Sequence, residues 1–369
     1  MDSASGEASL KIEFSPAARR VERSRLAEIH ANPGFGVHFT DHMFVAEWTP
    51  EHGWHDARVT GYAPISLDPA TAVLHYAQEI FEGLKAYRHD DGSVWTFRPE
   101  QNGARMIRSA RRLALPELPV PDFVASVDAL VRVDEHWVPG PEGEKSLYLR
   151  PFMFASEKFL GVRPSRHVTY MVIASPAGAY FPRGVHPVSI WLSEDYSRAA
   201  VGGMGAAKTG GNYAASLVAQ QEAIENGCDQ VVFLDAVERK WVEELGGMNL
   251  YFVHDDGTIT TPELSGTILE GITRSSIIEL CRQQGWKVEE RKVAVDEWRE
   301  GVTSGRITEV FACGTAAVIT PVGTLRWRGG EAGAGDDEIG PITQQVRRAL
   351  VDIQYGRAED TFGWMHRIL

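Results

Sequence analysis

The chain has few of the residues that mark a disulfide-rich or membrane protein. Its 369 residues include three cysteines, Cys228, Cys281 and Cys313, and no Cys-x-x-Cys pair. A sparse, odd set of cysteines indicates reduced thiols in the cytosol and argues against a disulfide framework or a zinc site. No apolar run approaches the roughly 20 residues of a membrane span, and the polar start resembles neither a signal nor a transit peptide. We therefore expect a soluble, cytoplasmic protein.

Positive charge is also in deficit. The formal net charge of −13 argues against a nucleic-acid or anionic-membrane partner. A cluster of histidines, His38, His42, His52 and His55, has neither thiolates nor regularly spaced carboxylates beside it, so no metal site is predicted. We expect these histidines to lie on a loop or strand surface. The length favours two domains with ample core.

Strand-like and helix-like patterns alternate without a regular βαβ repeat, which favours an α+β fold. We expect strands near 42–48 and 57–62, with hairpin turns at 51–53, 89–92 and 254–257. Helices are predicted over 69–82, 98–114, 212–226, 265–283 and 341–355.

A Pro- and Gly-rich stretch near 175–188 predicts a connection between two domains. The expected organisation is a loosely attached polar segment (1–30), an N-terminal domain (31–176), an interdomain loop (177–188) and a C-terminal domain (189–369).

One lysine, Lys208, stands in the glycine- and alanine-rich segment Gly-Gly-Met-Gly-Ala-Ala-Lys-Thr-Gly-Gly-Asn-Tyr-Ala (202–214). The small neighbours leave room for a flat group, and a desolvated amine there becomes a nucleophile. A phosphate-binding loop is the alternative interpretation. It is weaker, because alanine occupies position 207, where that motif requires glycine, and Gly210-Gly211 would weaken the following helix.

A lysine that binds pyridoxal phosphate needs a carboxylate for the ring nitrogen, donors for the ring oxygen and an anion site for the phosphate. Tyr213 lies five residues after Lys208, and Glu243-Glu244 follows an alternating, strand-like stretch. The segments Leu-Glu-Gly-Ile-Thr-Arg (269–274) and Gly-Thr-Ala-Ala (314–317) are typical of turns with free amides that suit a phosphate.

Six motifs, in order, resemble the bacterial branched-chain amino-acid aminotransferases of fold type IV. They are Phe-Thr-Asp-His-Met (39–43), Phe-Glu-Gly-Leu-Lys-Ala-Tyr (81–87), Tyr-Leu-Arg-Pro (148–151), Lys-Thr-Gly-Gly-Asn-Tyr (208–213), Glu-Leu-Gly-Gly-Met-Asn (244–249) and Gly-Thr-Ala (314–316). The resemblance runs from about residue 30 to the C-terminus. It implies a small N-terminal α/β domain and a larger C-terminal domain that binds pyridoxal 5'-phosphate and has a β-barrel-like core.

The resemblance implies that Lys208 forms the internal aldimine and moves the substrate proton. It places Glu244 at the ring nitrogen, with Glu243 facing solvent, and Tyr213 at the ring oxygen. The phosphate ligands would be Arg105, Ile272, Thr273 and Thr315. The amides of Thr315 and Ala316 would bind the substrate α-carboxylate.

Other residues would surround the substrate side chain. These are Phe35, Tyr76, Phe81, Tyr148, Arg150, Tyr180 and, from a partner subunit of a homodimer, Val162. The tyrosine hydroxyls and Arg150 would serve the distal carboxylate of glutamate. The implied reaction is a reversible ping-pong transfer of the amino group between leucine, isoleucine or valine and 2-oxoglutarate, as in branched-chain amino-acid biosynthesis.

Two positions depart from the pattern. Gly247 stands where many relatives carry threonine, and Ala317 and Thr320 stand where vertebrate members have a redox Cys-x-x-Cys, so thiol gating should be absent. A D-amino-acid aminotransferase or an aminodeoxychorismate lyase of the same fold type is an alternative, which the length of this chain disfavours.

Overall fold

The computed structural model describes residues 8–17, 20–178, 185–333 and 339–369. Its chain divides into two units. The first holds residues 1–180, 207–210 and 353–369, and the second holds 181–206 and 211–352. Each unit is built on one large sheet with helices, which confirms the expected α+β class.

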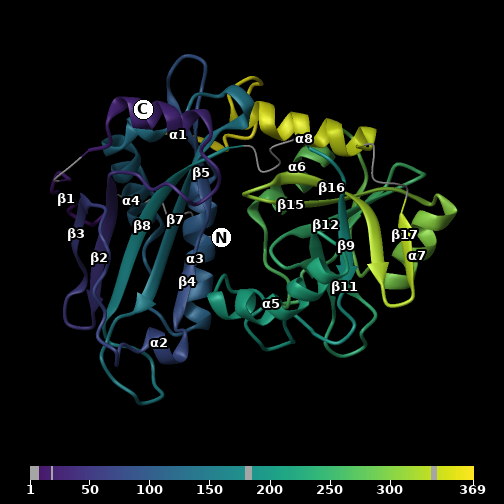
Figure 1. Cartoon of the computed structure of the whole chain (residues 1–369), viewed down its shortest axis with the longest axis horizontal. Coiled ribbons are helices and arrows are strands. Elements are labelled where there is room, and N and C mark those ends of the chain that lie inside the picture. Colours follow the sequence, from purple (N-terminus) through teal and green to yellow (C-terminus); the bar gives the residue numbers. More distant parts are fainter. Residues whose placement is uncertain (1–7, 18–19, 179–184, 334–338) are drawn as a thin grey trace. The chain divides into compact units, whose positions relative to one another are not determined.

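The first unit has a mostly antiparallel sheet. Its strands are β1 (Glu13–Phe14), β2 (His42–Thr49), β3 (Gly53–Gly61), β4 (Glu79–Phe81), β5 (Leu84–Arg88), β6 (Val94–Phe97), β7 (Ser146–Ala155), β8 (Val168–Ala177) and β18 (Met365–Arg367). Their order is β1-β3-β2-β8-β7-β5-β6-β18, with β4 also paired to β7. Figure 1 shows β1, β3, β2, β8 and β7 following one another in this order. The predicted hairpins at 51–53 and 89–92 are confirmed by the antiparallel pairs β2–β3 and β5–β6.

Helices of the first unit share its hydrophobic core with the strands. They are α1 (Arg23–Ala31), α2 (Val73–Tyr76), α3 (Pro99–Arg112) and α4 (Val120–Val133), with 3₁₀ turns η1 (Glu135–Trp137) and η2 (Glu142–Glu144). In α4, Phe123, Val127, Leu130 and Val131 recur on one helical face and are fully buried, in the same core as strands β2 and β8. Helix α3 begins at Pro99, whose fixed φ suits a first helical turn.

The second unit has a mixed sheet. Its strands are β9 (Val188–Leu192), β10 (Gln230–Leu234), β11 (Val242–Leu245), β12 (Asn249–His254), β13 (Ile259–Thr261), β14 (Val288–Glu290), β15 (Ile307–Gly314), β16 (Val318–Trp327) and β17 (Gly330–Gly333). Its helices are α5 (Gly210–Glu225), α6 (Ile272–Gln283), α7 (Val295–Ser304) and α8 (Pro341–Gln354), the first and last of which cross a unit boundary. The strand order is β11-β10-β9-β16-β15-β12-β13-β14, and β17 pairs with β16.

The second sheet curls into the barrel-like shape that the resemblance implied. Four strands lie between β11 and β12 in the sheet order, yet only residues 246–248 connect the two. Five strand spacings of about 4.8 Å would separate them by about 24 Å in a flat sheet. Four steps of about 3.8 Å between successive Cα atoms cannot span that distance. The tight turn, closed by a hydrogen bond from Leu245 N–H to Met248 O, therefore requires curvature.

Three of the five predicted helices lie close to the predicted bounds. The helices predicted at 98–114, 212–226 and 341–355 are confirmed as α3, α5 and α8, while α6 begins seven residues later than expected. The prediction of one helix over 69–82 is wrong, because α2 ends where Ala77 adopts a left-handed φ of 49° and β4 then begins. The valine-rich α4 was missed, since β-branched residues favour strands unless tertiary burial decides otherwise.

Both chain ends are attached differently from the expectation. Within residues 8–17 and 20–30, β1 pairs with β3, and Asp122 accepts hydrogen bonds from Ser9 and Leu10, so this segment is held more tightly than expected. Residues 353–369 were expected in the C-terminal domain, but β18 pairs with β6 in the first sheet. The first unit is consequently the longer one, whereas the larger domain was expected to be C-terminal.

None of the helices in the described parts of the chain combines the length and apolarity that a membrane span needs.

We expect the C-terminal strand to be held by a pH-dependent contact. His366 Nε2 lies 3.0 Å from Asp128 Oδ2, and this hydrogen bond raises the pKa of His366 above its ordinary value. A raised histidine pKa stabilises the fold fully below about pH 6.5 and loses that effect as the pH rises through the folded-state pKa. His366→Gln should therefore lower the free energy of unfolding by about 1–2 kcal/mol at pH 6 and by less at pH 9. Urea midpoints of both proteins test this, and an equal loss at both pH values would contradict it.

Candidate active site

Lys208 belongs to the first unit through the short segment 207–210. Its carbonyl oxygen accepts a hydrogen bond of 3.0 Å from the Phe81 N–H on β4, and its own N–H donates to Ser109 Oγ on α3 at 2.9 Å. Its Nζ lies 4.7 Å from the centroid of the Phe81 ring, within the range of a cation–π contact. The backbone of this lysine is therefore fixed by a strand and by a helix.

Four of the predicted substrate residues form a continuous series of contacts that reaches Lys208. Arg150 Cζ lies 4.7 Å from the Phe81 ring centroid, and Arg150 Nη2 donates to the Tyr148 hydroxyl at 3.0 Å. The Tyr148 ring packs edge-on against the Phe35 ring, with centroids 5.0 Å apart. The first unit thus combines an amine, a guanidinium, a phenol and two apolar rings.

Tyr76 contacts the segment between β7 and β8, which also holds Val162. Tyr76 ends α2, and its hydroxyl donates to the carbonyl oxygen of Leu160. Leu160 and Val162 are 65% and 89% exposed in the segment between β7 and β8. Tyr180 lies outside the described residues.

Arg105 is a buried residue of α3. Its Nε and Nη2 donate to the two carboxylate oxygens of Glu82, both at 2.8 Å, and Asn102 Nδ2 also donates to Glu82 at 2.8 Å. Glu82 is fully buried. This bidentate pair holds the guanidinium plane in one orientation.

In the second unit, Glu244 is buried on β11. Its Oε1 accepts the Leu269 N–H at 2.8 Å and lies 3.0 Å from Arg198 Nη1. The charge of Arg198, itself buried, offsets that of the carboxylate. Arg198 was not predicted as a site residue, because no motif in the sequence distinguishes it from a solvated arginine.

The start of helix α6 lies close to Glu244 in the same unit. Asn249 Nδ2 donates to Leu269 O at 3.1 Å, and the Leu269 N–H donates to Glu244. Both backbone polar groups of Leu269 are therefore hydrogen-bonded to side chains of β11 and β12. Gly271, which precedes the helix, has no side chain to cap the first turn, where Ile272 and Thr273 lie, and that turn has no acidic residue. Such a helix start attracts an anion.

Glycines bring the remaining predicted groups of the second unit together. A Cβ added at Gly247 would lie 3.6 Å from Tyr213 Cε1, an ordinary contact distance, so the Gly247 backbone lies beside that ring. A Cβ added at Gly314 would lie 3.3 Å from Met248 Cγ, which places the turn of Thr315 against the turn of Gly247. Thr315 and Ala316 are half-buried between β15 and β16.

The expectation that Glu243 faces solvent is wrong. Glu243 is 4% exposed, and its Oε1 accepts a hydrogen bond from Thr267 Oγ1. Burial raises the pKa of Glu243 against the effects of that bond and of the Arg198 charge. Glu243 and Glu244 do alternate along β11, but protein covers both faces of the strand, which a two-residue period cannot reveal.

The structure also argues against the phosphate-loop interpretation of 202–214. The Lys208 N–H donates to Ser109, and the Gly210 N–H donates to the carboxylate of Glu79. These amides already have protein acceptors, and a carboxylate at the loop would repel a phosphate.

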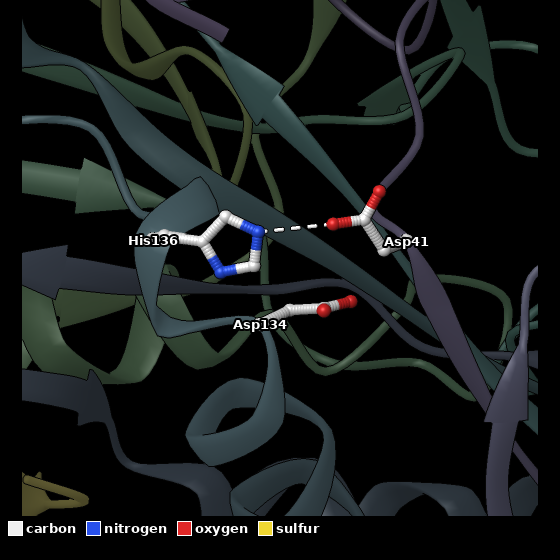
Figure 2. Close-up of side chains that lie close together, drawn as sticks. All are labelled: Asp41, Asp134 and His136. Atoms are coloured by element: carbon white, nitrogen blue, oxygen red, sulfur yellow. Dashed lines mark hydrogen bonds and ion pairs between the residues drawn. The ribbon is translucent and has the colours of Figure 1, made fainter. Parts of the chain in front are cut away.

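A different polar cluster, Asp41, Asp134 and His136, has the composition of a metal site. The His136 imidazole is directed at the Asp41 carboxylate (Figure 2). The distance from Nε2 to Oδ2 is 2.9 Å. Asp41 also accepts hydrogen bonds from Trp137 Nε1 and the Val21 N–H. Burial opposes the ionisation of Asp41, but these three hydrogen bonds together lower its pKa.

Asp134 is equally engaged. It accepts the His42 backbone N–H at 2.9 Å and lies 2.7 Å from His42 Nδ1. His42 Nε2 accepts the Ala17 N–H, which assigns the ring proton to Nδ1. His42 is therefore a buried structural residue, contrary to the expected surface position, and the cluster joins the N-terminal segment to the sheet.

Comparisons with known proteins agree on one family. A family model described as amino-transferase class IV matches residues 79–325. The chain is 62% identical to a probable branched-chain-amino-acid aminotransferase of Streptomyces coelicolor, over 97% of this chain and 98% of the relative. It is 56% identical to the branched-chain-amino-acid aminotransferase of Mycolicibacterium smegmatis, over 100% of both.

Solved structures are similar as well. The T.th. branched-chain amino acid aminotransferase with pyridoxamine 5'-phosphate has a TM-score of 0.74 and 29% identity, covering 88% of this chain and 98% of that one. The Escherichia coli branched-chain amino acid aminotransferase has a TM-score of 0.74 and 27% identity, covering 89% and 99%.

We expect the Glu82–Arg105 pair to be essential for the first unit. Glu82→Ala would leave the guanidinium buried without this carboxylate, which should cost about 3–5 kcal/mol of unfolding free energy. Glu117→Ala is the control, because its pair with Arg111 is exposed and should contribute about 1 kcal/mol or less. Urea unfolding measures both, and similar midpoints for the two variants would contradict the expectation.

Proposed function

The chain belongs to the class IV aminotransferases, and from this premise we propose that it is a pyridoxal-phosphate-dependent branched-chain-amino-acid transaminase. It transfers the amino group of leucine, isoleucine or valine to 2-oxoglutarate in a reversible ping-pong reaction. The observation that carries the proposal is the fixed backbone of Lys208, whose amine lies against Phe81 in a series of contacts with Arg150 and Tyr148. A D-specific transaminase or a lyase of the same fold type is not favoured.

The residues present fit pyridoxal phosphate. The start of α6 after Gly271 suits its phosphate, and the hydroxyl of Tyr213, whose ring lies beside Gly247, is a suitable donor for its ring oxygen. Glu244 is a buried carboxylate with a cationic neighbour, Arg198, and can pair with a protonated ring nitrogen. When bound, the cofactor supplies an aldehyde that bonds amines and a ring that accepts the electron pair of the substrate Cα.

Within this proposal, each residue has a defined task. Lys208 Nζ would hold the cofactor, take the proton from the substrate Cα and later return one. Glu244 would keep the ring nitrogen protonated, and Tyr213 would donate to the ring oxygen. Ile272, Thr273 and Thr315 would bind the phosphate, and Arg105, whose orientation Glu82 fixes, would be a further phosphate ligand.

Substrate recognition divides between apolar and polar groups. The amides of Thr315 and Ala316 bind the α-carboxylate, while Phe35, Tyr76 and Phe81 provide apolar surface for branched side chains. Arg150 and the tyrosine hydroxyls, including that of Tyr180, bind the distal carboxylate of glutamate.

We also propose a homodimer in the cytoplasm. Leu160 and Val162 are apolar and strongly exposed, as expected of side chains that a second subunit covers. Val162 would then contact the substrate bound by the partner subunit.

Lys208→Ala should abolish covalent capture of the cofactor and lower kcat by about 10²–10⁴-fold, because it removes the acid–base group. Borohydride treatment of the wild-type enzyme with pyridoxal phosphate should label a peptide that contains Lys208, as peptide mapping can show. The control is Lys158→Ala, which removes a lysine whose side chain is 70% exposed. A native rate in Lys208→Ala, or activity on D-alanine without activity on L-leucine, would refute the proposal.

Arg150→Gln should raise KM for 2-oxoglutarate about tenfold or more, because a charge-assisted contact with the distal carboxylate is lost. KM for L-leucine, which has no second carboxylate, should change by about threefold or less. Steady-state kinetics with both substrates measure the difference. Arg166→Gln, at an exposed ion pair with Glu51, is the control. Equal losses for both substrates would rule out this role for Arg150.

A further inference from the structure

Glu79, the first residue of strand β4, contacts the segment that carries Lys208. Its Oε1 accepts a hydrogen bond from the Gly210 N–H and lies 3.4 Å from Thr209 Oγ1. The backbone carbonyl oxygen of Glu79 accepts a hydrogen bond of 2.8 Å from the Thr209 hydroxyl. Two residues later on the same strand, the Phe81 N–H donates to Lys208 O at 3.0 Å. Strand β4 therefore holds three consecutive residues, 208–210, by side-chain and backbone bonds.

The fit between Glu79 and this segment is close. A Cβ added at Gly210 would clash with Glu79 Oε1, so only glycine allows this approach of carboxylate and backbone. Thr209 is 1% exposed, and the Lys208 N–H is held from the other side by Ser109. The Cα of Lys208 consequently has hydrogen-bonded anchors on both sides within two residues.

What matters about the Glu79 carboxylate is that it places a hydrogen-bond acceptor beside Gly210 and Thr209. Burial raises the pKa of Glu79, and the hydrogen bonds from Gly210 and Thr209, together with the charge of Arg150, offset this only in part. Burial thus disfavours the negative charge, whereas the two donors at Oε1 require an oxygen at that point. An amide oxygen at the same place would meet the same requirement.

We propose that Glu79 is a positioning residue, which places the amine of Lys208 for proton transfer by anchoring the backbone of residues 209–210. The inference rests on the proposed function, because it assigns the position of the amine that the reaction uses. A misplacement of a reacting group by about 1 Å can cost about 10²-fold in rate. The loss should appear in kcat, since Glu79 itself contacts neither substrate nor cofactor in this role.

Two substitutions separate position from charge. Glu79→Asp keeps the charge but withdraws the oxygens by one methylene, and Glu79→Gln keeps an oxygen in place but removes the charge. Glu79→Asp should lower kcat for L-leucine about 10–100-fold with KM within about twofold, whereas Glu79→Gln should keep kcat within about threefold of wild type. Glu51→Asp, the same shortening at an exposed glutamate, is the matched control and should leave kcat unchanged.

Amide hydrogen exchange of the full chain gives a readout that does not depend on activity. Peptides that cover 208–212 should exchange faster in Glu79→Asp, with and without added pyridoxal phosphate, but not in Glu79→Gln or Glu51→Asp. Wild-type exchange and kcat in Glu79→Asp would overturn the proposal, as would a loss of unfolding stability without a loss of kcat. A loss of kcat in Glu79→Gln with wild-type kcat in Glu79→Asp would show that charge, not position, matters, and would also overturn it.

Failure of the proposed function would look different. In that case the wild-type enzyme would not transaminate L-leucine, or borohydride would not label Lys208, while the exchange of 208–212 would still report on the Glu79 contact.

Discussion

The hydrogen bonds between strand β4 and residues 208–210 are the constraint on which the rest of the structure depends. The chain leaves the first unit after residue 180 and returns for four residues before it continues into helix α5. These residues are hydrogen-bonded to strand β4 and to helix α3. The amine of Lys208 lies against the aromatic ring of Phe81. Because that amine is part of the first unit, its position depends on the first sheet and not on the loops that flank it in sequence.

Buried charges organise both units in the same manner. Arg105 with Glu82, and Arg198 with Glu244, are arginine–carboxylate pairs in which every side chain is at most 5% exposed. Taking such groups out of water costs several kcal/mol per ion, which only close pairing offsets. Each pair therefore holds a guanidinium or a carboxylate in one orientation. Glu243, one residue from Glu244, instead stays buried with a raised pKa.

Much of the fold and site could be predicted from the sequence, for reasons visible in particular residues. Helices α3, α5 and α8 were predicted close to their bounds, and hairpin turns identified β2–β3 and β5–β6. Motifs singled out Lys208, Phe81, Tyr148 and Arg150, which the structure brings into one series of contacts. The sequence could not predict which polar residues pair when they are far apart in the chain. Examples are the hydrogen bonds of Glu82 with Arg105, Glu79 with Gly210 and His42 with Asp134. Local patterns show which residues are apolar, but not which polar residues meet.

The pairing of β18 with β6 has a consequence for the order of events during synthesis. The first sheet contains residues from both ends of the chain, since its last strand comes from Met365–Arg367. A ribosome that has made the first 180 residues has therefore not yet released all the strands of that sheet. The edge of β6 remains open for pairing until residues 365–367 emerge, and an open edge can pair with another chain. Completion of the first sheet therefore has to wait until the chain of the second unit has been made.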